Sequence, residues 1–76
     1  MNLNEVFSQN MKKLRTECSL SQEELAERSG LHRTYISLVE RNQRNITLKN
    51  LEKIAKGLEL PPYLLLVMED EKNEDD

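Results

Sequence analysis

Two sets of side chains in this sequence could do chemistry, and the first is the pair of Cys18 and His32. They are the only cysteine and the only histidine of the 76 residues, and their types suit a thiol nucleophile with its base, or a metal site. A metal site needs more ligands than this pair offers, and no glycine-rich segment accompanies them to hold an oxyanion. We therefore expect no enzymatic activity, no metal and no cofactor. Cys18 is expected to serve as partly buried packing.

The second set is the polar face of the segment "HRTYIS" and the residues after it. A helical rotation of about 100° per residue groups Arg33, Thr34 and Ser37 on one face and turns Ile36 and Val39 away from it. Arginine donates twice to guanine, and hydroxyl and methyl groups distinguish thymine from adenine. A merely solvated helix more often carries lysine and glutamate four residues apart. The pattern favours a helix that reads base edges over a solvated one.

The charge distribution separates a domain from a tail. Residues 69–76 carry six acidic side chains and one lysine, whereas residues 1–68 carry ten basic and eight acidic ones, a net charge of +2. Between residues 28 and 56, seven basic side chains face only two acidic ones. This excess is a candidate footprint for a polyanion, with an ordinary solvated surface as the alternative on charge alone. We predict one domain over residues 1–68 and a disordered acidic tail over residues 69–76.

Helical elements must position these side chains. The apolar residues Phe7, Met11, Leu14 and Cys18 share one helical face, which predicts a first helix over residues 5–17 capped by Asn4. Ser21 followed by Glu24 is a capping box, with Leu20 and Leu25 placed as its hydrophobic staple.

The second helix is predicted over Gln22–Ser29, ended by Gly30, and the third over Arg33–Arg41. Two short helices joined by a glycine turn, the second with a base-reading face, are predicted to form a helix-turn-helix.

The C-terminal part predicts two more helices. Thr47 caps a fourth helix, whose apolar stripe is Leu48, Leu51, Ile54, Ala55 and Leu58. A short fifth helix starts at Pro61-Pro62. The fold class is thus all-α, with five short helices. The stretch from Tyr63 to Met68 is apolar on every side, so we expect a homodimer held by Leu58, Leu60, Tyr63, Leu64, Leu65, Val67 and Met68.

Nothing in the sequence indicates a membrane or secretory route. No apolar run approaches the roughly 20 residues that span a bilayer. The N-terminal segment "MNLNEVFSQN" has no basic stretch ahead of an apolar one. The single cysteine agrees with a reducing compartment, so we expect a cytoplasmic protein.

The stretch "LSQEELAERSGLHRTYISLVERNQRNITLKNLEKIAKGL" resembles the lambda-repressor-like, or XRE-type, five-helix family of helix-turn-helix proteins. Within that family, "HRTYIS" followed by "VERNQRNIT" resembles the controller proteins of bacterial restriction–modification systems. The resemblance covers about residues 5–68.

The resemblance implies a function for individual residues. Arg33, Thr34 and Ser37 match positions that contact bases in the major groove. Contacts to the DNA backbone are implied for Gln22, Tyr35, Asn42, Arg44 and Asn45.

Several residues near this face keep two interpretations. Tyr35 also fits the rim of the core, and Leu38 is either a contact to a thymine methyl or an exposed leucine. His32 lies near the DNA backbone or caps the third helix. The resemblance pairs Glu40 with Arg15 as a structural ion pair that joins the first and third helices, with an exposed acid as the alternative for Glu40.

Two classes of function follow. The first is a homodimeric, sequence-specific transcription regulator that binds an operator in double-stranded DNA. The controller resemblance implies that it regulates its own promoter and that of the endonuclease, with a contact to RNA polymerase that no residue here identifies. The second is an antitoxin-like or other protein-interaction module that uses the apolar fifth helix. A protein that binds only other proteins would have no use for the base-reading face.

Overall fold

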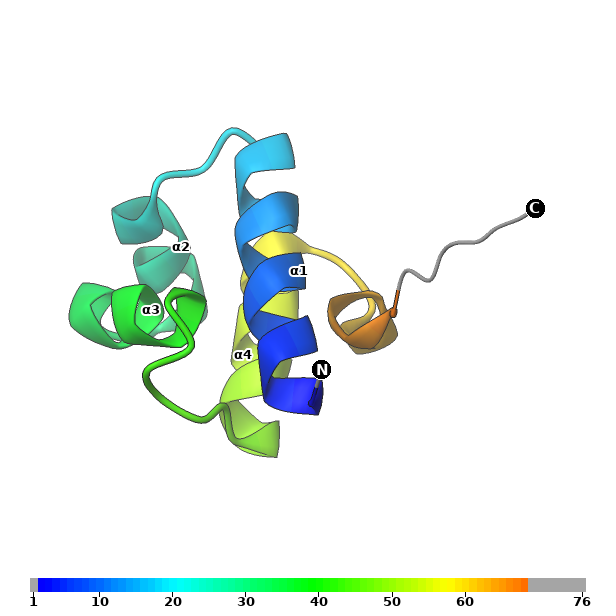
Figure 1. Ribbon diagram of the computed structural model, residues 1–76. Coiled ribbons are helices and arrows are strands. Elements are labelled where there is room, and N and C mark those ends of the chain that lie inside the picture. Colours follow the sequence, from blue (N-terminus) through cyan, green and yellow to red (C-terminus); the bar gives the residue numbers. More distant parts are fainter. Residues whose placement is uncertain (1, 69–76) are drawn as a thin grey trace.

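The computed structural model describes residues 2–68, which form four α-helices and one short 3₁₀ helix (Figure 1). The α-helices are α1 (Leu3–Glu17), α2 (Gln22–Ser29), α3 (Arg33–Glu40) and α4 (Leu48–Leu58), and the 3₁₀ helix is η1 (Pro62–Leu66). In Figure 1, α2 and α3 lie on one side of α1 and η1 lies on the other. The prediction of an all-α fold is confirmed for residues 2–68, which contain no strand. The predicted disordered tail, 69–76, lies outside the described residues.

Helix α1 begins two residues earlier than predicted, because Asn2 and not Asn4 caps it. The Asn2 side chain accepts a hydrogen bond from the Glu5 N–H (2.9 Å), and the Glu5 carboxylate accepts one from the Asn2 N–H (3.1 Å). This reciprocal pair is a capping box. The sequence holds asparagine at both positions, and only Asn2 is followed three residues later by a glutamate. Asn4 therefore lies inside the helix, and its side chain is available for another contact.

One hydrophobic core joins all five helices. Its fully buried side chains come from every helix: Phe7, Met11, Leu25, Ile36, Val39, Ile54 and Leu65. The apolar face predicted for the third helix is confirmed. Leu20 packs against the same cluster from the turn before α2. Cys18 was expected in this packing and is instead exposed, because α1 ends at Glu17 and Cys18 forms its C-cap.

Helices α2 and α4 meet at a close backbone approach. A Cβ added at Gly57 would lie 2.6 Å from the Ser29 hydroxyl oxygen and 3.3 Å from a methyl carbon of Leu25. Ser29 is buried, and its hydroxyl has no hydrogen-bond partner among residues 2–68. Only glycine at position 57 fits this crossing without displacing a neighbour.

Helix α4 starts at the predicted cap, but its first residue does not belong to the buried apolar stripe, contrary to the prediction. The Thr47 hydroxyl accepts a hydrogen bond from the Asn50 N–H (3.1 Å), as the capping prediction requires. Leu51, Ile54, Ala55 and Leu58 are buried. Leu48 is 84% exposed, so its assignment to the core stripe was wrong. At the first helical position it lies beyond the neighbouring helices that cover the rest of the stripe.

The fifth helix is a single 3₁₀ segment and not an α-helix. Its start carries the hydrogen bond from the Leu64 N–H to the Pro61 carbonyl (3.1 Å). The Asn10 amide of α1 donates to the carbonyl oxygens of Leu65 (3.0 Å) and Val67 (2.9 Å). Side-chain bonds from α1 thus take the carbonyls near the end of η1. These bonds join the end of η1 to α1.

The helices among residues 2–68 include none that is both long and apolar enough to cross a membrane. The same residues hold no cluster of three or more histidine, cysteine, aspartate or glutamate side chains suited to a metal ion.

Candidate nucleic-acid interface

A glycine turn joins α2 to α3 as predicted. Gly30 has a φ of 70°, in the left-handed region that glycine adopts at little cost. The Gly30 N–H donates to the Glu27 carbonyl (3.3 Å) and the Leu31 N–H to the Ala26 carbonyl (3.0 Å), which closes α2. His32 occupies the N-cap position of α3, but its side chain makes no capping hydrogen bond. The two helices form the predicted helix-turn-helix unit.

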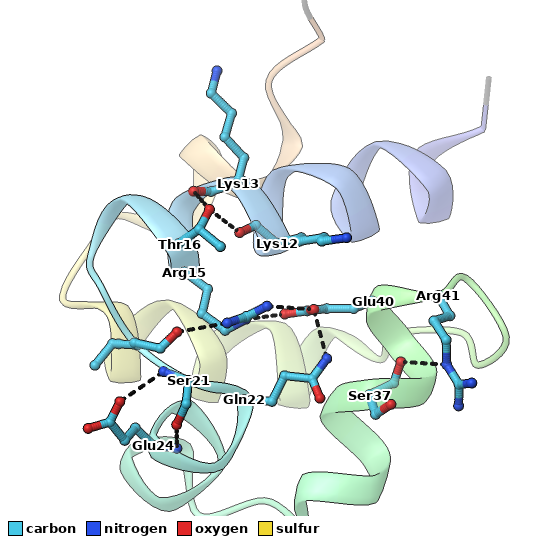
Figure 2. A network of polar contacts seen from close by, with 11 residues as sticks. Lys12, Lys13, Arg15, Thr16, Ser21, Gln22, Glu24, Ser37, Glu40 and Arg41 are labelled. Atoms are coloured by element: carbon cyan, nitrogen blue, oxygen red, sulfur yellow. Dashed lines mark hydrogen bonds and ion pairs between the residues drawn. The ribbon is translucent and has the colours of Figure 1, made fainter.

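The other end of α2 is fixed by the predicted capping box. Ser21 donates its backbone N–H to the Glu24 carboxylate (2.8 Å), and its hydroxyl accepts from the Glu24 N–H (2.9 Å) (Figure 2). Hydrogen bonding to the Glu24 carboxylate, first from the Ser21 backbone and then from the Ser21 side chain, lowers the pKa of Glu24. A carboxylate at this helix end interacts favourably with the helix dipole. The cap therefore fixes where α2 starts relative to the turn.

The polar face of α3 is open. Arg33 and Thr34 are exposed and Ser37 is half-buried. Within residues 2–68, the side chains of Arg33 and Thr34 form no hydrogen bond or ion pair. Arg41 folds back on the same helix, where its Nε donates to the Ser37 carbonyl at 3.4 Å (Figure 2). The predicted base-reading residues thus share one accessible face, and their contact with bases stays a prediction.

A polar cluster between three helices fixes the placement of α3 (Figure 2). Arg15 of α1 donates through Nε to one Glu40 carboxylate oxygen (2.5 Å) and through Nη2 to the other (3.1 Å). Its Nη1 also donates to the Leu20 carbonyl (2.7 Å). The Arg15 and Glu40 side chains are only 11% and 2% exposed. The predicted structural ion pair is confirmed, and its bidentate geometry sets the distance between α1 and the end of α3.

Gln22 belongs to the same cluster. Its side-chain amide nitrogen donates to the Glu40 carboxylate at 3.0 Å, and the residue is half-buried. Sequence reasoning assigned Gln22 to the DNA backbone and did not link it to Glu40. One amide hydrogen is used inside the protein, and the other has no partner within residues 2–68. The contact of Gln22 with the DNA backbone stays a prediction.

The side chain of Tyr35 lies between α3 and α4. It is half-buried, and its hydroxyl oxygen accepts a hydrogen bond from the Asn50 amide (3.0 Å). The Arg44 guanidinium lies 5.5 Å from the centre of the Tyr35 ring, within cation–π range. These residues line an open groove of about 490 Å³, together with Gly30, Leu31, His32, Thr34 and Leu38. The rim interpretation of Tyr35 is confirmed, because its ring packs against the core cluster. Its contact with the DNA backbone stays a prediction.

The loop that follows α3 is held by a residue that sequence reasoning assigned to a helix cap. The Asn4 side chain donates to the Asn42 amide oxygen (2.7 Å) and accepts from the Ile46 N–H (2.8 Å). Asn42 has a φ of 59°, which asparagine adopts more readily than most residues. Asn42, Arg44 and Asn45 are exposed. The three loop residues predicted at the DNA backbone thus lie on a segment fixed from α1.

The apolar residues predicted at a dimer interface divide into two groups. Leu58 and Leu65 are 4% and 0% exposed, so their assignment was wrong, because the core of the chain itself already covers them. Leu60 and Leu64 are half-buried, and Tyr63, Val67 and Met68 are exposed. The sequence shows that this short helix is apolar, but it does not show which of its side chains pack against the rest of the same domain.

Two further exposed leucines were not predicted. Leu3 is 58% exposed, and Leu48 extends from the start of α4. With Ile46 and Leu66 they line an open, mainly apolar groove of about 470 Å³ beside the loop after α3. No pattern in the sequence separates these positions from core leucines, because both begin helices with regular apolar spacing.

Comparison with known proteins finds similarity in both sequence and structure. Residues 11–65 match the family described as "Helix-turn-helix". Control protein C.SmaI of Serratia marcescens is 47% identical over 74 residues, covering 97% of this chain and 88% of that protein. Among solved structures, the restriction–modification controller protein C.AhdI from Aeromonas hydrophila aligns with a TM-score of 0.79 and 47% identity, over 82% of this chain and 94% of that one.

A further similarity is to a complex. C.Esp1396I bound to a 19 base pair DNA duplex aligns with a TM-score of 0.79 and 48% identity, over 86% of this chain and 87% of that one.

Proposed function

The chain belongs to the helix-turn-helix family, where it is similar to restriction–modification controller proteins, and from this premise we propose that it regulates transcription by binding specific DNA. The observation that carries the proposal is the open polar face of α3. Arg33 and Thr34 are exposed without a partner among residues 2–68, while a buried ion pair fixes the helix that carries them. Such free donors on a rigid helix suit recognition of base edges.

The residues divide into base readers and backbone binders. Arg33, Thr34 and Ser37 contact bases in the major groove. Backbone contacts come from residues on both sides of that face: Gln22, Tyr35, Asn42, Arg44 and Asn45. Gln22 retains a free amide hydrogen and Tyr35 its hydroxyl hydrogen, because each uses only part of its bonding capacity inside the protein.

The protein acts as a homodimer on an operator with twofold-related half-sites. Two α3 helices must lie about 34–36 Å apart to enter successive major grooves, which a twofold axis beside the apolar surface would allow. That surface includes the exposed residues Tyr63, Val67 and Met68 and the half-buried Leu60 and Leu64. Leu3 and Leu48 extend it toward the loop after α3. Burying such leucines in a second copy contributes about 1.5–3 kcal/mol for each side chain.

As a controller protein, it regulates its own promoter and that of a restriction endonuclease, in the cytoplasm and without catalysis. Activation involves a contact with RNA polymerase. Adjacent methyltransferase and endonuclease genes are expected in the genome, and an adjacent toxin gene in their place would favour the antitoxin-like alternative.

Binding to the DNA upstream of its own gene tests the proposal. Fluorescence anisotropy should give an affinity at least about a thousandfold higher for the operator in this DNA than for a scrambled duplex of equal length. The same titration with a duplex carrying one altered half-site serves as a control for the twofold arrangement. Equal affinity for operator and scrambled duplex would contradict sequence-specific regulation.

A further inference from the structure

We propose that Asn4 is a positioning residue for DNA binding, which holds the loop after α3 in the shape that meets the DNA backbone. The inference rests on the proposed function and deepens it. The Asn4 amide nitrogen and oxygen bond to Asn42 and Ile46 of the loop, so the proposed role of Asn4 is an action through the loop and not a contact with DNA. It acts from α1 on residues about 40 positions later in the chain.

The loop has little hydrogen bonding of its own. Its first residues close α3, with the Asn42 N–H on the Val39 carbonyl (3.0 Å) and the Gln43 N–H on the Leu38 carbonyl (2.8 Å). Helix α4 then starts with the Leu51 N–H on the Thr47 carbonyl. Between these points the structure gives the backbone N–H groups of Arg44 and Asn45 no hydrogen bond. Within the described part of the chain, the Ile46 N–H bonds only to Asn4.

The Asn4 amide bonds to a residue on each side of this stretch, whose backbone N–H groups have no hydrogen bond within residues 2–68. Its oxygen accepts from the backbone of Ile46 (2.8 Å) and its nitrogen donates to the side chain of Asn42 (2.7 Å). Asparagine has both a donor and an acceptor on one short side chain, so one residue bridges the two segments. Arg44 and Asn45 lie between the bridged residues and are exposed.

The position of Asn4 is itself fixed. The capping box of Asn2 and Glu5 surrounds it in the first turn of α1. The Ser8 hydroxyl lies within hydrogen-bond distance of the Asn4 carbonyl (3.0 Å) and the Val39 carbonyl (2.6 Å). The start of α1 is therefore joined to the end of α3 as well as to the loop. Because the loop is already held in place, it loses less conformational entropy when it binds DNA.

Asn4→Ala tests the proposal with little risk to α1, because alanine is the stronger helix former. Gln9→Ala is the matched control, since Gln9 is exposed on the same helix and has no bonded partner within residues 2–68. Asn4→Ser repeats the test with a side chain that suits a first helical turn and is too short to bridge the loop. Circular dichroism confirms that each variant is folded before binding is measured.

Binding is measured to the operator and to a scrambled duplex across a range of salt concentrations. Both Asn4 variants should bind the two DNAs more weakly by the same factor, with a salt slope lower by about one for each phosphate that the loop no longer neutralises. Gln9→Ala should bind as the wild type does. If the wild type does not prefer the operator, the proposed function fails. If it does and the Asn4 variants match it in affinity and slope, only this inference fails.

A double-mutant cycle with Arg44→Ala separates positioning from general stability. If Asn4 acts by placing Arg44, then Asn4→Ala should weaken binding much less in the Arg44→Ala background than in the wild type. Additive effects would overturn the proposal. Without DNA, amide hydrogen exchange at Ile46 should accelerate in Asn4→Ala while the core of α4 is unchanged. Unchanged exchange at Ile46 would likewise overturn it.

Discussion

Arg33 and Arg44 are both exposed arginines, yet their surroundings predict different contributions to binding. Arg33 opens α3 on its polar face without a partner in residues 2–68, whereas Arg44 lies in the loop against the ring of Tyr35. Arg33→Ala should cost about 1–3 kcal/mol on the operator and relax the preference at one base pair. Arg44→Ala should weaken operator and scrambled DNA alike and lower the salt slope by about one per phosphate. Equal effects on both DNAs for Arg33→Ala would instead identify Arg33 as a phosphate contact.

The buried pair of Arg15 and Glu40 predicts a decrease in stability when it is broken. Arg15→Met leaves the Glu40 carboxylate, which is 2% exposed, without its cation. The free energy of unfolding should fall by about 3–5 kcal/mol, measured by urea denaturation. Arg28→Ala is the control, because Arg28 and Glu59 pair at 3.9 Å with both side chains mainly exposed, and such pairs contribute at most about 1 kcal/mol. Similar decreases for both variants would contradict the assignment of Arg15 as structural.

At the scale of the helices, the crossing of α2 and α4 limits the size of the side chain at residue 57, and a substitution can measure this limit. Gly57→Ala gains helix propensity, about 1 kcal/mol, but places a methyl 2.6 Å from the Ser29 hydroxyl oxygen. Overpacking of this kind costs about 1–3 kcal/mol, so the unfolding midpoint should fall. Ser29→Ala removes that oxygen, which has no hydrogen-bond partner in the described part of the chain, and should restore much of the stability in the double variant. A midpoint that rises in Gly57→Ala alone would show that the crossing adjusts freely.

The sequence predicted those helices that carry local signals. The caps at Ser21 and Thr47 and the turn at Gly30 are confirmed, because a cap depends on residues within one turn of the helix. The cap assigned to Asn4 failed although the signal for Asn2, a glutamate three residues later, is also local. The other assignments that failed depend on distant contacts. Leu48 and Leu65 have the same side chain, yet one is exposed and the other buried.

The candidate site follows the same division between local and distant contacts. The helical period alone grouped the polar face of α3. The bridge from Asn4 to Asn42 and Ile46 could not be predicted, because it joins segments that only the folded chain brings together.

At the scale of the whole molecule, the proposed dimer predicts a dependence on Leu48. The side chain is 84% exposed beside Leu3 and Leu66, so Leu48→Glu would place a charge in the interface. The dissociation constant of the dimer, measured by analytical ultracentrifugation, should rise by at least about tenfold, which corresponds to about 1.4 kcal/mol. Gln9→Glu adds the same charge elsewhere on the surface and should leave the dimer intact. A wild-type protein that is monomeric at high micromolar concentration would contradict the proposal.

Binding to the operator should also depend steeply on salt. Only charged side chains release counterions, and Arg44 is the one cation among the proposed backbone contacts. Two subunits therefore neutralise at least two phosphates, and affinity should fall by at least about tenfold between about 50 and 200 mM salt. The net charge of +2 on residues 1–68 is small, so such a slope would come from the placement of a few cations. A flat response would mean that the basic segment is an ordinary solvated surface.

The pair of Arg15 and Glu40 also constrains how this sequence can diverge over generations. Replacement of either residue alone leaves a buried charge without its partner, and a chain of this size has little stability to lose. A lineage can therefore replace the pair with apolar residues only if both changes arise close together or a stabilising substitution comes first. Arg28 and Glu59 face no such barrier, because water solvates whichever charge remains. Two ion pairs in one small domain should thus accumulate substitutions at different rates.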